Sequence, residues 1–338
     1  MADALLSPVV GAAMCAVSAA ADAYAVKKIE KDDLCEKKIP IMGVMGAFVF
    51  AAQMINFTIP ATGSSGHIGG GILLAAMIGG FPALLSVSAV LIIQCLFFAD
   101  GGLLALGCNI FNMGVIPCLI AYPLIFKPLV KNGRTFGKIT AASVIGSVLA
   151  LQLGALCVVL ETQLSGITEL PLWTFLALMQ PIHLAIGLIE GVITAAVLCF
   201  VYKMRPEIME STFAKTAIPK GVPMKKVLIA LAAVTLLTGG ALSNFASSDP
   251  DGLEWAVEKT AGAGGLEADG AVFDGAASIR QAVAFMPDYD FKDAGEEDSG
   301  IGTAVAGIVG GVITFAAAGA AAIGISVFKK RRKGASRA

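Results

Sequence analysis

Long apolar runs separated by short polar segments dominate the chain. Nine such runs occur, at residues 4–26, 40–60, 68–81, 83–99, 103–126, 138–160, 178–202, 227–246 and 302–328. An α-helix rises 1.5 Å per residue, so about 20 apolar residues cross the hydrocarbon core of a bilayer. The run at 68–81 is short for such a helix and ends in GGFPA. The pattern predicts an all-α polytopic membrane protein with about nine transmembrane helices.

Composition supports this fold class and excludes others. Hydrophobic residues make up 57% of the 338 positions and charged residues 14%, whereas soluble proteins carry about 25% charged residues. An ordinary soluble domain is therefore excluded. The 24 basic and 25 acidic residues leave no basic surplus for nucleic acid. The seven cysteines are an odd number and lie mostly in apolar runs, so they are interpreted as packing residues and not as a disulfide framework.

Charge is distributed unevenly and predicts the topology. Basic residues gather in four segments, at 27–39, 127–138, 203–226 and 329–338, whereas residues 247–301 hold 13 acidic residues against three basic ones. By the positive-inside rule the basic segments are cytoplasmic. The acidic segment is then outside, the N-terminus is outside and the C-terminus is cytoplasmic. The first apolar run has no basic residue before it, so it is not expected to be a cleaved signal peptide.

The same pattern divides the chain into parts. Residues 1–205 hold seven of the predicted helices, residues 206–226 form a basic cytoplasmic linker, and residues 227–338 form a two-helix module around the acidic extracytoplasmic loop 247–301. The last predicted helix carries small residues at intervals of four, which would let a neighbouring helix approach closely. These residues are Gly302, Ala306, Gly310 and Thr314.

The segment ATGSSGHIGGG, residues 61–71, is the first candidate site. It surrounds His67 with five glycines and two serines. So many glycines break a helix, and broken backbone is tolerated in a bilayer only where protein buries it or where it lines a cavity. Imidazole is a common ligand of transition metals. His67 is thus either a metal ligand or the histidine of a tight turn bonded to a carbonyl, and residue chemistry alone favours neither.

His183, the second of two histidines, is followed seven residues later by Glu190 on the same helix face. The two side chains are interpreted as an interhelical hydrogen-bonding pair in preference to a second ligand set or a relay. Asp100 and Asn109 bracket a Gly-rich turn at 98–114. Asp100 is expected to cap the following helix or to meet water rather than to ligate a metal directly.

The segment GRTFGKIT, residues 133–140, resembles a phosphate-binding loop in composition, but its residue spacing differs from that of a P-loop. Only three residues separate its glycines, and Ile139 follows Lys138, whereas a P-loop needs four intervening residues and a Ser or Thr after the Lys. A solvated cytoplasmic loop is the better interpretation. The chain is therefore not expected to hydrolyse ATP itself.

Four segments in order resemble a known family. They are MADALLSPVVG, QMINFTIPATGSSGHIGGG, FFADGGLLALGCNIFNMG and HLAIGLIEG, and together they resemble CbiM/NikM, the substrate-specific (S) component of cobalt or nickel energy-coupling-factor importers. FASSDPDGLEWAVEK at 245–259 and MPDYDF at 286–291 resemble the small NikN or PDGLE-type partner. The chain thus looks like a fusion of the two.

The resemblance implies a non-enzymatic subunit in the cell membrane of a prokaryote, without catalytic residues or a permanently bound cofactor. It implies capture of Co²⁺ or Ni²⁺ outside and delivery inward, with two ABC-type ATPase subunits and a transmembrane scaffold subunit as partners. In the family the metal is held by the N-terminal amine, a backbone amide nitrogen, a histidine at position two and the histidine of the Gly-rich segment. Carried over, this gives His67 as a ligand and Met1 as part of the site. Expected around the ligands are Asp3, Ser64, Ser65, Asp100 and Asn109.

One departure from the family concerns the start of the chain. Members begin with Met-His, whereas this sequence begins Met1-Ala2-Asp3. We expect translation to start two codons earlier, which would restore the histidine. Two other functions differ in class: a membrane metal sensor or scaffold, and an ATP-independent metal permease. An intramembrane metalloenzyme is disfavoured, because the two histidines are 116 residues apart and show no His-Glu-x-x-His spacing.

Overall fold

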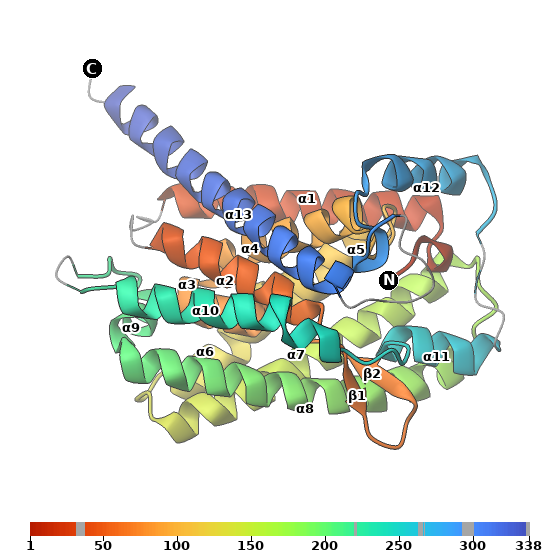
Figure 1. Ribbon diagram of the computed structural model, residues 1–338, viewed down its shortest axis with the longest axis horizontal. Coiled ribbons are helices and arrows are strands. Elements are labelled where there is room, and N and C mark those ends of the chain that lie inside the picture. The colour runs from red at the N-terminus through yellow and green to blue at the C-terminus, as the bar shows by residue number, and fades with distance from the viewer. Residues whose placement is uncertain (32–37, 220–221, 263–265, 267, 293–300, 336–338) are drawn as a thin grey trace.

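The computed structural model describes residues 1–31, 38–219, 222–262, 266, 268–292 and 301–335. The described chain forms a bundle of helices that run mostly along its longest axis, with a single small β-hairpin (Figure 1). The all-α class of the sequence prediction is confirmed. The described cysteines are free thiols, of which Cys95, Cys108 and Cys118 are buried in the packing. Cys35 lies outside the described residues.

Six stretches of helix in the described chain are long and apolar enough to cross a membrane. They belong to α1 (Pro8–Lys31), α4 (Gly80–Phe97), the continuous α5 (Leu106–Ile110), η2 (Phe111–Phe126) and α6 (Lys127–Val130), α7 (Phe136–Ser165), α8 (Leu172–Met204) and α13 (Ile301–Ala335). Shorter helices occupy the other three apolar runs, and these are α2 (Lys38–Gln53), α3 (Gly71–Ile78) and α10 (Lys225–Gly240). Nine helices of full membrane-spanning length are therefore not found among the described residues.

The prediction of a transmembrane helix at 68–81 is wrong. The run is split at Gly79: α3 has only eight residues, a rise of about 12 Å, and Gly80 and Phe81 already belong to α4. The glycines before it keep residues 67–70 out of the helix, and Gly79, with a φ of +95°, ends it. The stretch from β2 to the end of α3 is held at both ends. The Ser65 N–H donates to the Pro250 carbonyl at one end, and the Thr212 hydroxyl donates to the Met77 carbonyl at the other.

Proline shapes the helix that packs beside α3. Pro117 and Pro123 lie inside η2, a π-helical segment. Proline has no N–H to donate to the helical ladder, so the regular bonding pattern is interrupted there. A Cβ on Gly71 would lie 2.5 Å from Pro117 Cγ. The glycine therefore permits a close approach of α3 to η2, and both Gly71 and Pro117 line the cavity described below.

The small residues of α13 do allow a close helix contact, as predicted. A Cβ on Gly310 would meet the Phe50 ring of α2 at 2.0 Å, and one on Gly46 of α2 would meet Thr314 at 3.4 Å. Phe50 is fully buried as a result. α13 thus packs the C-terminal module against the N-terminal bundle.

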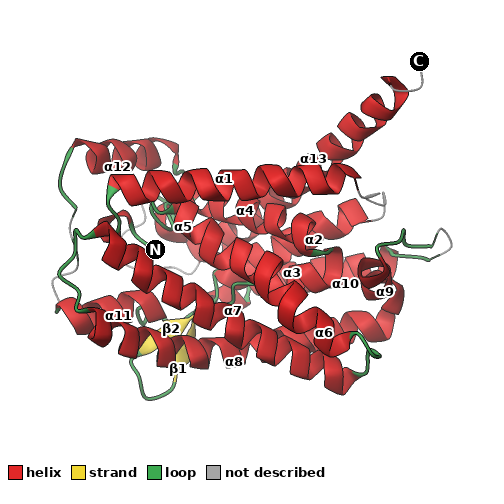
Figure 2. Ribbon diagram, turned by 180° about the vertical axis from the view of Figure 1, so that it is seen from behind, coloured by secondary structure: helices red, strands yellow, loops and turns green. Residues whose placement is uncertain are grey.

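The two ends of the bundle differ in charge. The α6–α7 connection and α9 (Pro206–Ala214), which belong to basic segments, lie at one end, and the N-terminus lies at the other with α11 (Gly252–Ala261) and α12 (Ala271–Val283) (Figures 1 and 2). The described part of the acidic segment 247–301, which was expected to be a loop, contains the α-helices α11 and α12 and a 3-10 turn, η4 (Pro287–Tyr289). Asp251 begins α11 by accepting hydrogen bonds from the Leu253 and Glu254 N–H groups, and Glu254 bonds back to the Asp251 N–H.

Candidate metal site

A β-hairpin positions His67. β1 (Phe57–Ile59) pairs antiparallel with β2 (Ser64–Gly66), with Thr58 opposite Ser65. His67 follows β2 directly and is half-buried. Its Nδ1 lies 3.2 Å from the Ile68 carbonyl oxygen. The Gly-rich segment is thus a strand and an extended turn and not a helix, as its glycines predict.

The backbone after His67 is held by a buried carboxylate. Glu190 of α8 accepts the Gly69 N–H at 2.8 Å and the Gly70 N–H at 3.1 Å, one on each oxygen. Gln53 donates to the Gly69 carbonyl at 2.9 Å. Gly70 has a φ of +75°, a conformation that glycine adopts without strain. Glu190 therefore fixes the turn that carries His67.

His183 lies on α8, one helical turn after Met179, and bonds to the Met179 carbonyl. Its Nδ1 is 2.8 Å from the Met179 oxygen. A carbonyl only accepts, so Nδ1 carries the proton and the neutral ring keeps its lone pair on Nε2. Among the described residues, both rings make their hydrogen bonds through Nδ1. Of this pair, expected to make interhelical hydrogen bonds, His183 bonds within its own helix, whereas Glu190 bonds to the turn before α3.

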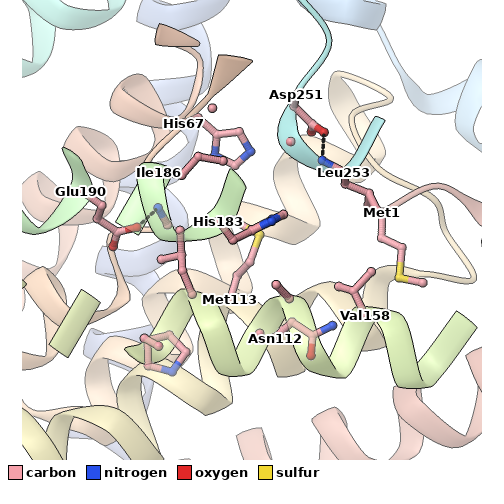
Figure 3. Close-up of a pocket in the computed structure, with 18 of the residues that line it drawn as sticks. Met1, His67, Asn112, Met113, Val158, His183, Ile186, Glu190, Asp251 and Leu253 are labelled. Atoms are coloured by element: carbon pink, nitrogen blue, oxygen red, sulfur yellow. Dashed lines mark hydrogen bonds between the residues drawn. The ribbon is translucent and has the colours of Figure 1, made fainter. Parts of the chain in front are cut away.

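Both histidines line one cavity of about 140 Å³. Figure 3 shows His67 and His183 reaching it from different elements, with Glu190 to the left of both in this view. The volume is enough for an ion with part of its water shell. The wall is otherwise largely apolar, with contributions from Met113, Pro117, Ala150, Leu151, Ala155, Val158, Met179 and Ile186.

The N-terminus is tied down at the edge of this cavity. Asp3 accepts the N–H groups of Leu104 and Ala105 on Oδ1, at 2.8 and 3.1 Å, and that of Leu103 on Oδ2. The Gly102 N–H donates to the Met1 carbonyl at 3.0 Å. Met1 and Asn109 both line the cavity. Asp3 thus anchors the chain start beside the histidines without lining the cavity itself.

The other sequence candidates lie apart from the cavity wall. Ser64 and Ser65 are buried in β2, and neither lines the cavity. Asp100 accepts a hydrogen bond from the Tyr289 hydroxyl of the MPDYDF segment. The structure therefore brings His67, Met1 and Asn109 together, and places Asp100 at a contact with the C-terminal module.

A wall of the cavity comes from the C-terminal module, which sequence reasoning missed. Asp251, Gly252 and Leu253, the central residues of PDGLE, line it. The Ser65 N–H donates to the Pro250 carbonyl at 2.8 Å, and the Ser65 hydroxyl donates to the Asp249 carbonyl at 2.7 Å. The PDGLE motif could be recognised in the sequence, but the sequence did not indicate that this motif would contact the hairpin that carries His67.

A second buried polar pair lies beside the cavity. Asn112, which lines it, donates to Glu161 at 2.8 Å. Asn112 Oδ1 and Glu161 Oε1 are buried without a hydrogen-bond partner. Sequence reasoning also missed this pair, because Glu161 lies just after the apolar run at 138–160 and its contact with Asn112 comes from the packing of α7 against η2.

The donor set of the cavity is rich in nitrogen. The Glu190 oxygens accept backbone N–H groups, and Asp251 caps α11. Across the described ranges, no group of three or more His, Cys, Asp or Glu side chains is arranged around one point. A metal here would rely on two imidazoles and on main-chain or terminal groups.

Comparison with known proteins identifies both parts of the chain. The family model CbiM, described as cobalt uptake substrate-specific transmembrane region, matches residues 1–208. The chain belongs to the CbiM family. The PDGLE domain matches residues 225–326. The resemblance drawn from the sequence motifs is thereby confirmed.

Relatives of this CbiM-family chain share the fused arrangement in their names. A putative fused nickel transport protein NikMN of Archaeoglobus fulgidus is 32% identical over 281 residues, 83% of this chain and 85% of the relative. A fused nickel transport protein NikMN of Rhodobacter capsulatus is 28% identical over 64% of this chain and 65% of that one. The solved crystal structure of a transition metal transporter has a TM-score of 0.54 and 30% identity, covering 62% of this chain and 97% of that chain.

Proposed function

We propose that the chain is the substrate-binding membrane subunit of an ATP-driven energy-coupling-factor importer, with Ni²⁺ or Co²⁺ as its cargo. The observation that carries this proposal is the cavity lined by His67 and His183. Membership of the CbiM family and the nickel and cobalt transport names of its relatives support the same cargo.

The donor chemistry suits these ions. Neutral imidazole is a good ligand for Ni²⁺ and Co²⁺, whereas Mg²⁺ and Ca²⁺ prefer oxygen. The Nδ1–H of a metal-bound histidine usually donates to a carbonyl or carboxylate, which orients the ring. His183 already makes such a bond to Met179. We assign His67 and His183 as imidazole donors, with the N-terminal segment at Met1 completing the site as the family resemblance implies.

The surrounding residues position these donors. Asp3 holds the N-terminal segment, and Glu190 holds the turn after His67. Asn109 Nδ2 lies 3.5 Å from the Met1 carbonyl, and Ser65 holds the PDGLE segment. Residues 1–205 thus form the binding unit, residues 206–226 the linker, and residues 227–338 a module that covers the cavity.

The direction of transport follows from the charged ends. The cavity lies at the end with α11, α12 and the N-terminus, which we assign to the outside, and the basic end is cytoplasmic. The ion is captured from outside and released inward, in the cell membrane of a prokaryote. ATP hydrolysis belongs to two ABC-type partner subunits, which act through a transmembrane scaffold subunit.

Uptake of radioactive nickel and cobalt tests this function. Cells that express the chain together with ATPase and scaffold subunits of an energy-coupling-factor system are predicted to accumulate the ion, and cells lacking either the chain or a working ATPase are not. Equal uptake without the ATPases would indicate an ATP-independent permease. Binding without any uptake would indicate a sensor or scaffold.

A further inference from the structure

The loop between α4 and α5 holds the start of the chain. The Gly102 N–H of this loop donates to the Met1 carbonyl at 3.0 Å, and Asp3 accepts the N–H groups of residues 103–105. A Cβ on Gly102 would overlap the Asp3 carboxylate, so the first residues lie directly against the loop. Met1 lines the metal cavity. The place of Met1 in that cavity therefore depends on the place of the loop.

The C-terminal module fixes the other side of the same loop. Beyond α12, the Phe285 N–H donates to the Phe97 carbonyl at 3.2 Å, and the Asp288 N–H donates to the Phe98 carbonyl at 2.8 Å. The Tyr289 ring stacks on the Phe98 ring, with 5.1 Å between the ring centroids. α12 and the N-terminus lie at the same end of the bundle (Figures 1 and 2). The loop thus lies between the N-terminal segment and the C-terminal module.

Arg280 of α12 holds the turn of this loop. Its Nη1 donates to the Gly101 carbonyl at 2.8 Å and to the Ala99 carbonyl at 3.4 Å. Ala99 has a φ of +55°, a conformation that is strained for a residue with a Cβ. Such strain persists only where the surrounding structure holds it. The guanidinium stabilises the turn, because a charged donor makes a stronger hydrogen bond than a neutral one.

One peptide group connects Arg280 to Met1. The Gly101 carbonyl accepts a hydrogen bond from the guanidinium, and the N–H of the same amide, which belongs to Gly102, donates to the Met1 carbonyl. A charged donor at the carbonyl oxygen polarises the amide and strengthens the hydrogen bond that its N–H makes. Gly102 is buried, which shields this second bond from competing water. The guanidinium and Met1 are therefore coupled through two consecutive hydrogen bonds.

We propose that Arg280 is a positioning residue of the metal site and holds Met1 at the cavity through the Gly101–Gly102 peptide group. This inference rests on the proposed function, in which Met1 completes the site. The described residues that line the cavity do not include Arg280, so it acts through the loop and not by contact with the ion. Its charge alone has the opposite effect, because a guanidinium repels a cation. The sign of the change in affinity on removing Arg280 therefore separates positioning from charge.

Equilibrium titration of the purified full chain with Ni²⁺ tests the proposal. Arg280→Gln is predicted to weaken binding about tenfold, a typical effect of losing a residue that orients a metal ligand. Arg280→Lys keeps a charged donor but has a single ammonium in place of the planar guanidinium. Its affinity should therefore lie between those of Arg280→Gln and the unaltered chain.

The matched control is Lys292→Gln. It removes the same charge from an exposed lysine of the same module, and that lysine donates to the Gln281 carbonyl. The control is predicted to bind Ni²⁺ like the unaltered chain, because the hydrogen bonds between Arg280, the loop and Met1 are retained.

Hydrogen–deuterium exchange of the metal-free chain measures whether the effect is local. Arg280→Gln is predicted to speed exchange of the N–H groups at residues 102–105, while α11 exchanges at the rate of the unaltered chain. A general loosening of the fold would speed exchange in α11 as well, and that result would contradict a positioning role.

Equal or tighter Ni²⁺ binding by Arg280→Gln would overturn the proposal, and so would equal weakening in Lys292→Gln. In both cases the unaltered chain still binds Ni²⁺, so the proposed function stands. Absence of Ni²⁺ binding by the unaltered chain would contradict the proposed function, and this inference with it.

Discussion

Ser65 and Pro250 are joined by a main-chain hydrogen bond of 2.8 Å, although 185 positions separate them along the chain. Ser65 belongs to the hairpin that carries His67, and Pro250 opens the PDGLE segment of the other module. The wall of the candidate metal cavity is therefore shared between the two modules. Substitutions in the PDGLE segment should therefore change how the metal is bound.

Gly252→Ala is predicted to loosen this shared wall. A Cβ there would lie 2.9 Å from Ile186 Cδ1 and 3.4 Å from the His183 ring. Such overpacking costs about 1–3 kcal/mol, so bound Ni²⁺ should dissociate faster from the variant. Stopped-flow release to a chelator measures this rate. Gly275→Ala is the control, because a Cβ there meets nothing within 4 Å. Identical release rates would show that the PDGLE segment does not enclose the metal.

Glu190→Gln is predicted to lower metal affinity although Glu190 need not touch the ion. Its two oxygens accept Gly69 and Gly70 N–H groups, and an amide has only one acceptor oxygen. A buried N–H left without an acceptor costs about 1–3 kcal/mol, which should also lower the melting temperature. Thermal denaturation with and without Ni²⁺ measures both effects. The exposed Glu169→Gln should behave like the unaltered chain, and an equal response from the two variants would contradict this role of Glu190.

Asp3→Ala is predicted to release the N-terminal segment from the cavity. Three N–H groups at residues 103–105 would lose their acceptor. Loss of the acceptor of such N–H groups costs about 1–3 kcal/mol, and metal affinity should fall about tenfold because Met1 is no longer held. Isothermal titration with Ni²⁺ measures the change, with the exposed Asp274→Ala as control. Unaltered affinity in Asp3→Ala would place the N-terminal segment outside the site.

Glu254 gives a prediction on pH. The nearby Asp251 carboxylate, and secondarily burial, raise the pKa of Glu254 above its ordinary value. The folded chain then binds this proton more tightly than the unfolded chain, so stability falls as the pH rises through the pKa range. Glu254→Gln keeps the capping bond and removes the charge. It should raise the melting temperature at neutral pH and leave it unchanged at acidic pH. A lowered melting temperature at neutral pH would contradict this interpretation.

The long helices could be predicted from the sequence, because a run of about 20 apolar residues is what a helix needs to cross the bilayer. The runs at 138–160 and 178–202 became α7 and α8 with extended ends. The glycines of 61–71 correctly predicted broken backbone. The run at 68–81 was predicted as one helix, whereas its glycines leave residues 68–70 outside the helix and Gly79 separates α3 from α4.

The cavity itself could not be assembled from the sequence. His67 and His183 are far apart in the chain, and helical periodicity says which residues share a face of one helix but not which helix that face meets. Glu190 accepts backbone N–H groups, and because nearly every residue has an N–H, the sequence does not indicate which ones it binds. The position of PDGLE beside His67 is likewise a tertiary relationship, carried by Ser65.

The central claim is that His67 holds the transported ion. Equilibrium titration of the purified full chain with Ni²⁺ and Co²⁺ tests it most directly, with the exposed Asn132→Ala at the opposite end as control. His67→Ala is predicted to weaken binding at least about tenfold, with His183→Phe also weakened and Asn132→Ala unchanged. Undiminished affinity of His67→Ala for both ions would contradict the account.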